Sequence, residues 1–211
     1  MRLPIARQGL PYIAAGLLLV VLLGAWGNRW SFIPALLLAG FVTAFFRDPE
    51  RKIPLEKGAI LSPADGRVLL VEPQGKEGDA AAAGLKISIF MSVFNCHVNR
   101  LPVTGTIRDI CYTPGCFYAA HQERASKQNE QNALRLEMED GREVTVVQIA
   151  GLIARRIVCW VKVGDRLPAG TRFGLIQFGS RVDLYLPPGI RLAVRRGDRV
   201  KAGLSVMGYW A

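Results

Sequence analysis

The chain has 211 residues, carries 27 basic against 17 acidic side chains for a net charge of +10, and is half hydrophobic. One modest domain with a membrane-associated segment fits these bounds. The basic residues are spread along the chain, without a lysine-rich block or interleaved aromatic residues. The charge therefore favours an anionic lipid surface as partner and argues against nucleic acid.

The four cysteines form no CxxC pair, and only two histidines accompany them. This pattern argues against a zinc site and against a disulfide framework. We expect free thiols, buried in a domain that occupies a reducing compartment. The cysteines are Cys96, Cys111, Cys116 and Cys159.

Two uncharged, apolar runs occupy the N-terminal part of the chain. Residues 8–28 form a run of 21, and residues 30–46 form a run of 17. Each approaches the roughly 20 residues that a helix needs to cross about 30 Å of hydrocarbon. The flanking basic residues are Arg2, Arg7, Arg47, Arg51 and Lys52. By the positive-inside rule, residues 1–47 are predicted to form a transmembrane helical hairpin in the cell inner (plasma) membrane, with both ends cytoplasmic.

A secretory signal peptide is the alternative for the first run, because Arg2 and Arg7 resemble its charged leader. No small-residue cleavage site follows, whereas a second apolar run does, so we prefer the anchor. A shallow hairpin within one leaflet also stays open. Residues 48–211 are long enough to bury a core and are expected on the cytoplasmic side.

Residues 48–211 are predicted to form a mostly β domain of the α+β class. Short β-branched and aliphatic stretches at 66–71, 85–91, 143–149 and 156–163 are separated by Gly, Pro and Asp, a pattern typical of strands. Residues 119–132 lack Gly and Pro and are rich in Glu, Gln, Lys and Asn. They predict a helix or a polar loop with a solvated, charged face.

A short repeat lies near the C-terminus, where GDRLPAG at 164–170 recurs 33 residues later as GDRVKAG at 197–203. Such turns need positive φ, which glycine adopts without penalty. Paired hairpins of this kind resemble the two halves of a lipoyl or biotinyl carrier domain, a β barrel-sandwich. Where a carrier presents a lysine at a hairpin tip, this chain has Phe178, Gly179, Ser180 and Arg181.

A Gly-Ser dipeptide by itself usually marks a turn. Here apolar residues surround Gly179 and Ser180, and a strand-like alternation runs from 174 to 186. A turn at this point would interrupt the strand pattern without an evident structural need.

Several segments together resemble the phosphatidylserine decarboxylase family, in its short bacterial, pyruvoyl-dependent type. The similarity covers nearly the whole chain, beginning with the N-terminal hairpin. The segments are FRDP at 46–49, SPADG at 62–66, FMS at 90–92 through HVNR at 97–100, GLIARR at 151–156 and FGS at 178–180.

This resemblance implies a proenzyme in which the Ser180 hydroxyl attacks the carbonyl of Gly179 and turns the peptide bond into an ester. Glycine suits this step because it leaves the carbonyl open and tolerates a strained backbone. Elimination and hydrolysis would give a β chain of residues 1–179 and an α chain of residues 180–211 that begins with a pyruvoyl group. No metal and no diffusible cofactor are implied.

The implied reaction is decarboxylation of phosphatidylserine to phosphatidylethanolamine and CO2, in phospholipid biosynthesis. The pyruvoyl ketone would form a Schiff base with the serine headgroup and act as the electron sink. The family also implies an α/β heterodimer that assembles into a homo-oligomer. Two alternatives stay open: the same chemistry on another serine-headgroup lipid, and a non-enzymatic, membrane-anchored adaptor in which Gly179 and Ser180 form only a hairpin tip.

Self-cleavage needs a base and an orienting partner, because serine is a weak nucleophile at its normal pKa. Asp65 matches the aspartate of the family's Ser-Pro-x-Asp-Gly motif, which belongs to a self-cleavage triad with a histidine and the serine. Longer members carry two histidines three residues apart; here His97 takes the first slot and Arg100 the second. The resemblance thus implies that His97 serves the site, in self-cleavage or in substrate chemistry. For self-cleavage, His121, or Asp65 with a different helper, stays open as an alternative. If the resemblance is set aside, Asp65 fits an ordinary turn residue before Gly66, and His97 fits a hydrogen-bonded histidine that caps a strand.

Arg155 and Arg156 are candidate contacts for the phosphodiester, because guanidinium groups pair well with phosphate oxygens. A solvated strand edge is the alternative for both. His121 is a further candidate on the substrate side, followed by Lys127, Asn129 and Asn132.

Overall fold

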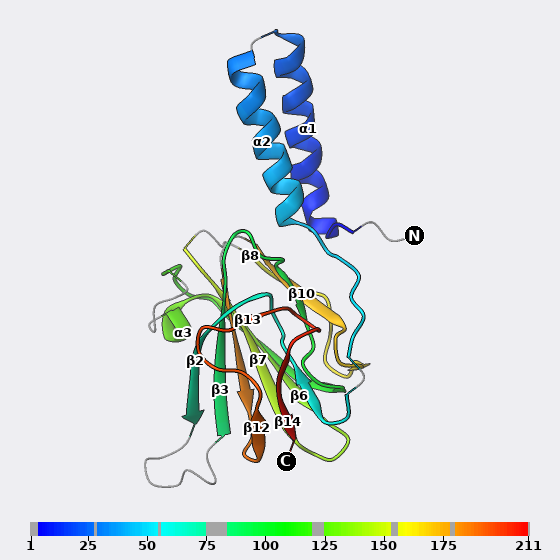
Figure 1. Cartoon of the computed structure of the whole chain (residues 1–211), viewed down its shortest axis with the longest axis vertical. Coiled ribbons are helices and arrows are strands. Elements are labelled where there is room, and N and C mark those ends of the chain that lie inside the picture. Colours follow the sequence, from blue (N-terminus) through cyan, green and yellow to red (C-terminus); the bar gives the residue numbers. More distant parts are fainter. Residues whose placement is uncertain are drawn as a thin grey trace. The chain divides into compact units, whose positions relative to one another are not determined.

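The computed structural model describes residues 4–27, 29–54, 56–74, 84–119, 125–152, 156–177 and 180–210. The chain divides into two compact units, Met1–Glu50 and Arg51–Ala211. The first is helical and the second is mostly β (Figure 1).

The N-terminal unit is a pair of helices, α1 (Leu10–Ala25) and α2 (Arg29–Phe45), preceded by the single 3-10 turn η1 (Arg7–Gly9). The two ends of the pair are joined, because Ala6 N–H donates to Phe46 O at 2.8 Å. Glycine is required at Gly9, where a Cβ would lie 2.4 Å from the Phe46 side chain.

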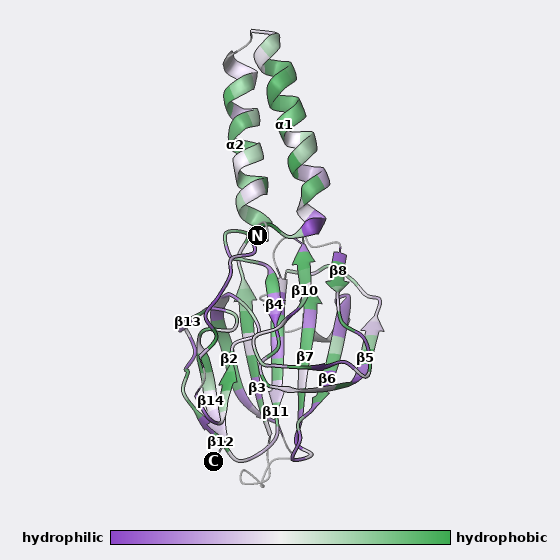
Figure 2. Cartoon of the chain, turned by 90° about the vertical axis from the view of Figure 1, so that its right-hand side faces the viewer, coloured by the Kyte–Doolittle hydropathy of each residue, from purple (hydrophilic) through white to green (hydrophobic). Residues whose placement is uncertain are grey.

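The surface of the helical pair is apolar. No residue of α1 is buried, and side chains such as Leu18 and Val21 are 60% and 66% exposed. Figure 2 shows the hydrophobic colour along both helices. Among the described residues, one helix, Arg7–Ala25, is long and apolar enough to cross a membrane, and Trp30–Phe45 is a shorter apolar helix.

In the described residues of the second unit, the strands form three antiparallel sheets. The largest has eight strands in the order β13-β2-β3-β11-β7-β6-β5-β9, and two three-stranded sheets have the orders β4-β10-β8 and β1-β14-β12. The bounds are β1 Ala59–Leu61, β2 Gly66–Gln74, β3 Gly84–Met91, β4 Val98–Arg100, β5 Gly105–Thr113, α3 Ala125–Gln128, β6 Gln131–Glu137, β7 Glu143–Ala150, β8 Arg156–Cys159, β9 Arg166–Leu167, β10 Arg172–Gln177, β11 Ser180–Leu186, β12 Ile190–Leu192, β13 Arg199–Val200 and β14 Val206–Trp210.

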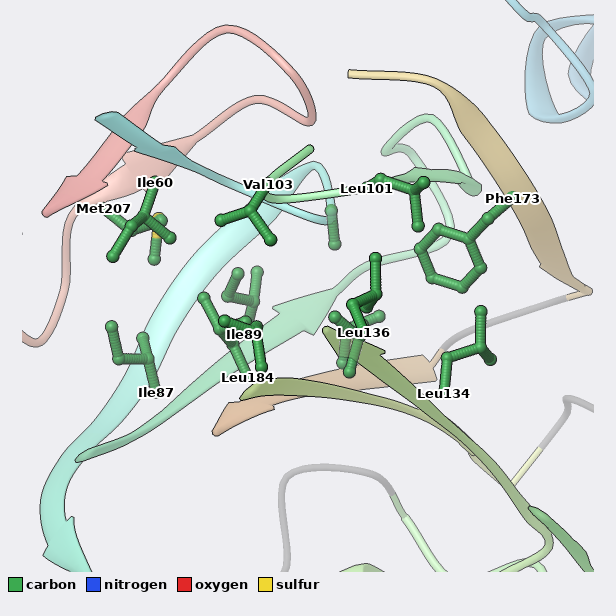
Figure 3. Packing of buried hydrophobic residues seen from close by; sticks show 14 of the residues in the cluster. Ile60, Ile87, Ile89, Leu101, Val103, Leu134, Leu136, Phe173, Leu184 and Met207 are labelled. Atoms are coloured by element: carbon green, nitrogen blue, oxygen red, sulfur yellow. The ribbon is translucent and has the colours of Figure 1, made fainter. Parts of the chain in front are cut away.

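The hydrophobic core lies between one face of the large sheet and the segments opposite it. Figure 3 shows Ile87, Ile89, Leu184, Leu134 and Leu136 on the side of the large sheet, facing a second row of side chains. That row comprises Met207, Ile60, Val103, Leu101 and Phe173. Each of these side chains is at most 2% exposed, and burying one stabilises the fold by roughly 1.5–3 kcal/mol.

The sequence repeat has a counterpart in the backbone hydrogen bonds. The equivalent bonds, donor first, are Val68–Asp198 and Ile107–Asp165 at 2.9 Å, and Gly203–Ser62 and Gly170–Leu101 at 2.8 Å. Residues 62–68 therefore occupy in one copy the place that residues 101–107 occupy in the other. The four turn glycines of the repeat all have positive φ, between 68° and 97°, which confirms the prediction for both turns.

The predicted strands at 66–71, 85–91 and 143–149 are confirmed as β2, β3 and β7, whereas the strand predicted at 156–163 ends at Cys159. The uninterrupted strand expected from 174 to 186 is wrong. Its residues form β10 and β11, which belong to different sheets. Almost every residue of both strands is buried, so the apolar pattern continues through the change of sheet.

Two further expectations need correction. In the region 119–132 only Ala125–Gln128 is helical among the described residues, and β6 begins at Gln131. Asn129, Glu130 and Asn132 are buried, so the described C-terminal end of this segment does not form the expected solvated face, whereas Gln128 is exposed. Of the cysteines, Cys96 is buried but Cys111 and Cys116 are exposed.

Candidate active site

Ser180 is the first residue of β11, at the centre of the large sheet. It pairs with Met91 at the end of β3 on one side and with Ala150 at the end of β7 on the other. Its side chain has the same parity as Val182 and Leu184, which belong to the core, so it faces the core side of the sheet. The residue is fully buried and does not form an exposed hairpin tip.

The Ser180 hydroxyl donates a hydrogen bond to the thioether sulfur of Met91, at 3.4 Å. Sulfur is a weak acceptor, so this bond holds the hydroxyl in place without committing it strongly. The same sulfur accepts a long contact from Asn99 Nδ2, at 3.7 Å. Met91 therefore lies between a serine hydroxyl and a buried amide.

A chain of buried amides leads away from this point through the core. Gln148 Nε2 donates to Asn99 Oδ1 at 2.9 Å, and Asn132 Nδ2 donates to Gln148 Oε1 at 3.1 Å. All three side chains are buried, the most exposed at only 3%. Burying polar groups in an apolar core costs free energy unless they are paired. The three hydrogen-bonded amides therefore form a polar network at the Ser180 end of the core.

His97 immediately precedes β4 and is fully buried. Its carbonyl accepts a bond from Ile176 N–H at 3.3 Å, so the extended pairing with β10 continues to this residue. Strand alternation then puts His97 on the same face of β4 as Asn99. Ring atom Nδ1 lies 3.0 Å from Asn95 O. Because a carbonyl only accepts, Nδ1 carries the proton and Nε2 of the neutral ring carries the lone pair.

Asp65 sits in the turn before β2 and is 8% exposed. Its Oδ1 accepts bonds from Arg51 Nη1 at 2.6 Å and from Ala202 N–H at 2.8 Å, and its Oδ2 accepts one from Arg51 Nη2 at 2.9 Å. The equivalent position in the other half of the repeat is Thr104, whose Oγ1 accepts from Ala169 N–H at 3.0 Å. Both halves thus have a backbone N–H, of Ala202 or Ala169, that donates to the side chain at the equivalent position. The pairing with Arg51 distinguishes the Asp65 half.

Asp65 and Ser180 lie at the same end of the large sheet. Phe90 of β3 pairs with both Arg67 of β2 and Arg181 of β11, so β3 separates the two strands. Neighbouring strands lie about 4.8 Å apart, which puts the two residues on the order of 10 Å apart across the sheet. Glycine must follow Asp65, because a Cβ at Gly66 would lie 2.0 Å from Phe90 O.

The outer face of β11 carries a buried ionic cluster directly behind Ser180. Arg181 Nε donates to Asp183 Oδ1 at 2.5 Å, and Arg181 Nη2 donates to Ser88 Oγ at 2.7 Å. Lys86 Nζ lies 3.3 Å from the other oxygen of Asp183. These bonds tie β11 to β3 from the side opposite the amide chain.

The remaining sequence candidates are less informative. Gly179, Arg155 and His121 lie outside the described residues, as does the side chain of Lys127. Arg156 is exposed at the start of β8, so its predicted role stays a prediction. Asn129, proposed for substrate, instead donates to Ala150 O at 2.7 Å and to Tyr118 O at 2.8 Å, and thereby fixes the residue that pairs with Ser180.

Sequence reasoning missed Arg51, Met91, Asn99 and Gln148 as site residues. Gln148 had a usable signal, because it interrupts the inward-facing series Val144, Val146 and Ala150 of β7. A polar residue on the buried face of a strand needs a buried partner. Met91 and Asn99 lie within the family segments FMS at 90–92 and HVNR at 97–100, but their residue types by themselves indicate no chemical role.

A cavity of about 690 Å³ lies at the opposite end of β7 from Ala150, beside the turn that joins β6 and β7. Met138, Arg142 and Trp210 are among its lining residues, as are Thr104 and Ala169 of the other half of the repeat. Ser180, Met91, Asn99, His97 and Asp65 do not line it. The cavity is therefore separate from the surroundings of Ser180.

The family model that matches this chain, over residues 38–208, describes phosphatidylserine decarboxylase. Three similar proteins bear the name phosphatidylserine decarboxylase proenzyme. That of Ralstonia nicotianae is 51% identical over 205 residues, which are 96% of this chain and 94% of the relative. That of Nitrosomonas eutropha is 50% identical over 204 residues, with the same coverage of 96% and 94%.

The third, from Desulfotalea psychrophila, is 44% identical over 207 residues, which are 98% of this chain and 97% of the relative. The match with the family model and the near full-length identities place the chain in one class of carboxy-lyases. The chain belongs to the phosphatidylserine decarboxylase family.

Proposed function

We propose that this chain is a self-processing phosphatidylserine decarboxylase that cuts itself between Gly179 and Ser180 and converts phosphatidylserine to phosphatidylethanolamine and CO2. The observation that carries the proposal is the identity of 44% to 51% with proenzymes of that name over nearly their full length. The burial of Ser180 at the start of a central strand supports the assignment of the reacting residue.

Residue 180 suits a pyruvoyl group, which supplies a ketone as electron sink for decarboxylation. Ser180 is buried between Met91 and Ala150, so water is largely excluded from this point. The residues after it, Arg181 to Leu186, are paired with β3, and most are also paired with β7. A chain that begins at residue 180 would therefore keep its first strand in place.

The two chains are expected to stay together after cleavage. Residues 180–211 would contribute β11, β12, β13 and β14. β11 lies between β3 and β7, β13 pairs with β2, and β14 pairs with β1, so the small chain is hydrogen-bonded to the large one in two sheets. This interleaving supports an α/β heterodimer, and further assembly into a homo-oligomer remains an expectation.

We assign His97 as the general base of self-cleavage or of the substrate step, because its Nε2 carries the lone pair when Nδ1 donates to Asn95 O. Asp65 already accepts three hydrogen bonds. We therefore assign it a positioning role, in which it holds Arg51 and the turn at Ala202. Arg155, Arg156 and His121 stay candidates for the substrate side.

We further propose that the β unit has the barrel-sandwich architecture of lipoyl and biotinyl carrier domains, supported by the paired backbone bonds of the two repeat copies. The helical pair would anchor this unit in the inner membrane with the β unit on the cytoplasmic side. The apolar, exposed surface of α1 supports insertion into lipid, where phosphatidylserine resides.

The proposal is tested by comparing the purified protein with its Ser180→Ala variant on a denaturing gel and in vesicles that contain phosphatidylserine. We expect two fragments and CO2 release from the unsubstituted protein, and neither from the variant. An uncut protein without turnover would support the adaptor alternative. Cleavage without turnover of phosphatidylserine, but with turnover of another serine-headgroup lipid, would reassign the substrate.

A further inference from the structure

We propose that Asn99 supplies the hydrogen-bond donor for the oxyanion that forms during self-cleavage, and that Gln148 and Asn132 fix the direction of its amide. This inference rests on the proposed self-cleavage at Ser180. It gives a chemical role to Asn99 and Gln148, for which the sequence predictions named none, and it gives Asn132 a role other than the substrate contact predicted for it.

The direction of the amide chain follows from Pro63, whose carbonyl oxygen can only accept a hydrogen bond. Asn99 Nδ2 lies 3.5 Å from that oxygen, whereas a flipped Asn99 would bring two acceptor oxygens together. Asn99 Oδ1 therefore faces Gln148 and accepts from Gln148 Nε2, and Gln148 Oε1 accepts in turn from Asn132 Nδ2.

Within the part of the chain that the structure describes, the NH2 group of Asn99 makes only long contacts, at 3.5 Å to Pro63 O and 3.7 Å to the Met91 sulfur. Asn99 is fully buried, and a buried amide donor normally finds a strong acceptor within about 2.7–3.2 Å. This donor is thus held in the core, oriented, and weakly used. Such a group is suited to an acceptor that appears only during a reaction.

The Met91 sulfur connects this donor to the reacting hydroxyl. Ser180 Oγ lies 3.4 Å from the sulfur and Asn99 Nδ2 lies 3.7 Å from it, so the two atoms are no farther apart than the sum of these distances. Methionine is flexible and adapts its rotamer easily. Displacement of the thioether would open the space between the amide and the oxyanion oxygen, which in the intermediate is bonded to the same carbon as Oγ.

Space for the amide chain is provided by a glycine in the facing strand. A Cβ at Gly174 of β10 would lie 2.8 Å from Gln148 Nε2 and 2.4 Å from Val158 O. Any side chain there would displace Gln148 and release the orientation of Asn99. The small residue is therefore matched to the amide chain on the opposite sheet.

The step that the donor serves can be written with its electrons balanced. Ser180 Oγ forms a bond to the carbonyl carbon of Gly179, its proton passes to the base assigned above, and the carbonyl electron pair moves onto the oxygen. Asn99 Nδ2 donates to that oxyanion. The carbonyl then re-forms as the bond to the residue 180 nitrogen breaks, and that nitrogen takes up a proton to become an amine.

The test follows the appearance of the two fragments during cell-free synthesis into phospholipid vesicles. Asn99→Asp keeps the acceptor for Gln148 but replaces the NH2 group by an oxygen, and loss of one oxyanion donor slows a reaction by about 100- to 1,000-fold. Gln148→Glu should slow cleavage in the same way while residue 99 stays Asn. The amide of Asn99 would turn its NH2 group toward the new carboxylate and away from the oxyanion. Asn99→Ala removes the amide and leaves a cavity.

Folding is scored separately by thermal unfolding of each variant on a Ser180→Ala background, where every chain stays uncut. Val98→Ala is the matched control, since Val98 is equally buried on β4 but faces away from Asn99; it should lose stability and still cut at close to the unsubstituted rate.

Neutral hydroxylamine distinguishes a block before the ester from a block after it, because it cleaves an accumulated ester. It should not release fragments from the Asn99 variants, in which the ester does not accumulate.

The outcomes separate this inference from the proposed function. If the unsubstituted protein is cut while folded Asn99→Asp, Asn99→Ala or Gln148→Glu is cut equally fast, Asn99 is not the donor. Hydroxylamine-released fragments from these variants would place the defect after the ester and would also overturn the inference. If the unsubstituted protein is not cut at all, the proposed function itself fails.

Discussion

Arg51 and Asp65 form a buried, two-armed ion pair, with Nη1–Oδ1 at 2.6 Å and Nη2–Oδ2 at 2.9 Å. Asp65 also accepts a hydrogen bond from Ala202 N–H. The other half of the repeat has an equivalent bond, from Ala169 N–H to Thr104, but a threonine side chain carries no charge and forms no ion pair. The local fold therefore explains why an acceptor is present at position 65. It does not by itself explain why that acceptor is charged.

Because the ion pair with Arg51 is separate from the bond to Ala202, substitutions can distinguish a structural role of Asp65 from a chemical one. Asp65→Thr alone should leave a buried guanidinium without its carboxylate and destabilise the fold by roughly 3–5 kcal/mol. Combining it with Arg51→Met should recover most of that loss, because threonine can still accept from Ala202 N–H. We expect the double variant to unfold cooperatively in urea yet to cut itself slowly. Cleavage at the unsubstituted rate would reduce Asp65 to a structural residue.

His97 can be tested by a substitution that keeps its known hydrogen bond. His97→Asn retains a side-chain N–H able to donate to Asn95 O, as Nδ1 does at 3.0 Å, but lacks the basic Nε2. Loss of a general base slows a reaction by about 100- to 10,000-fold. Rates of fragment formation and of decarboxylation, measured separately, should show which step slows. A fully active His97→Asn protein would leave His97 with the strand-capping role only.

Arg181 should hold the small chain in place after cleavage. Arg181→Met removes both guanidinium bonds to the fully buried Asp183, from Nε at 2.5 Å and from Nη2 at 3.2 Å, and breaking a buried pair costs about 3–5 kcal/mol. We expect the residue 180–211 fragment to dissociate at a lower urea concentration, as followed by gel filtration. Arg195→Ala is the control, because its contact with Asp198 is exposed and contributes little; equal behaviour of the two variants would contradict this account.

Glu137 offers a pH-dependent contribution outside the site. Its hydrogen bonds with Arg108, at 2.6 Å and 3.1 Å, lower the pKa of the Glu137 carboxyl from its ordinary value. A lowered pKa in the folded state stabilises the fold above the unfolded pKa, and this stabilisation is lost as the pH falls through the folded value. Glu137→Gln should therefore lower the thermal midpoint slightly at neutral pH and not at strongly acid pH. A difference that grows in acid would have the wrong sign.

The sequence could predict the features that depend on local chemistry. The turns at 164–170 and 197–203 were predictable because glycines are spaced for positive φ, and the apolar helices because uncharged runs are unmistakable. The change of sheet between β10 and β11 was not, since almost every residue of both strands is buried and an alternating pattern does not record which sheet a strand joins. Asp65 and Ser180 were found through the family motifs.

The partners of these residues required the fold. Arg51 lies 14 positions from Asp65, and Asn99 reaches Gln148 across 49 positions, so no local pattern connects them. Asn129 and its neighbour Glu130, predicted to be solvated, are buried, and Asn129 is paired with backbone groups of distant segments. Composition alone cannot distinguish a polar side chain that is exposed to water from one that is buried and hydrogen-bonded to backbone groups.

The mass of the small fragment tests the central claim most directly. Self-cleavage at Gly179–Ser180 predicts a 32-residue fragment, residues 180–211, whose terminus is a pyruvoyl group and which therefore resists sequencing from its N-terminus. Its mass should lie below that of the unmodified peptide by the difference between serine and a pyruvoyl group. A fragment with an ordinary serine amine, or a cut at another bond, would contradict the account.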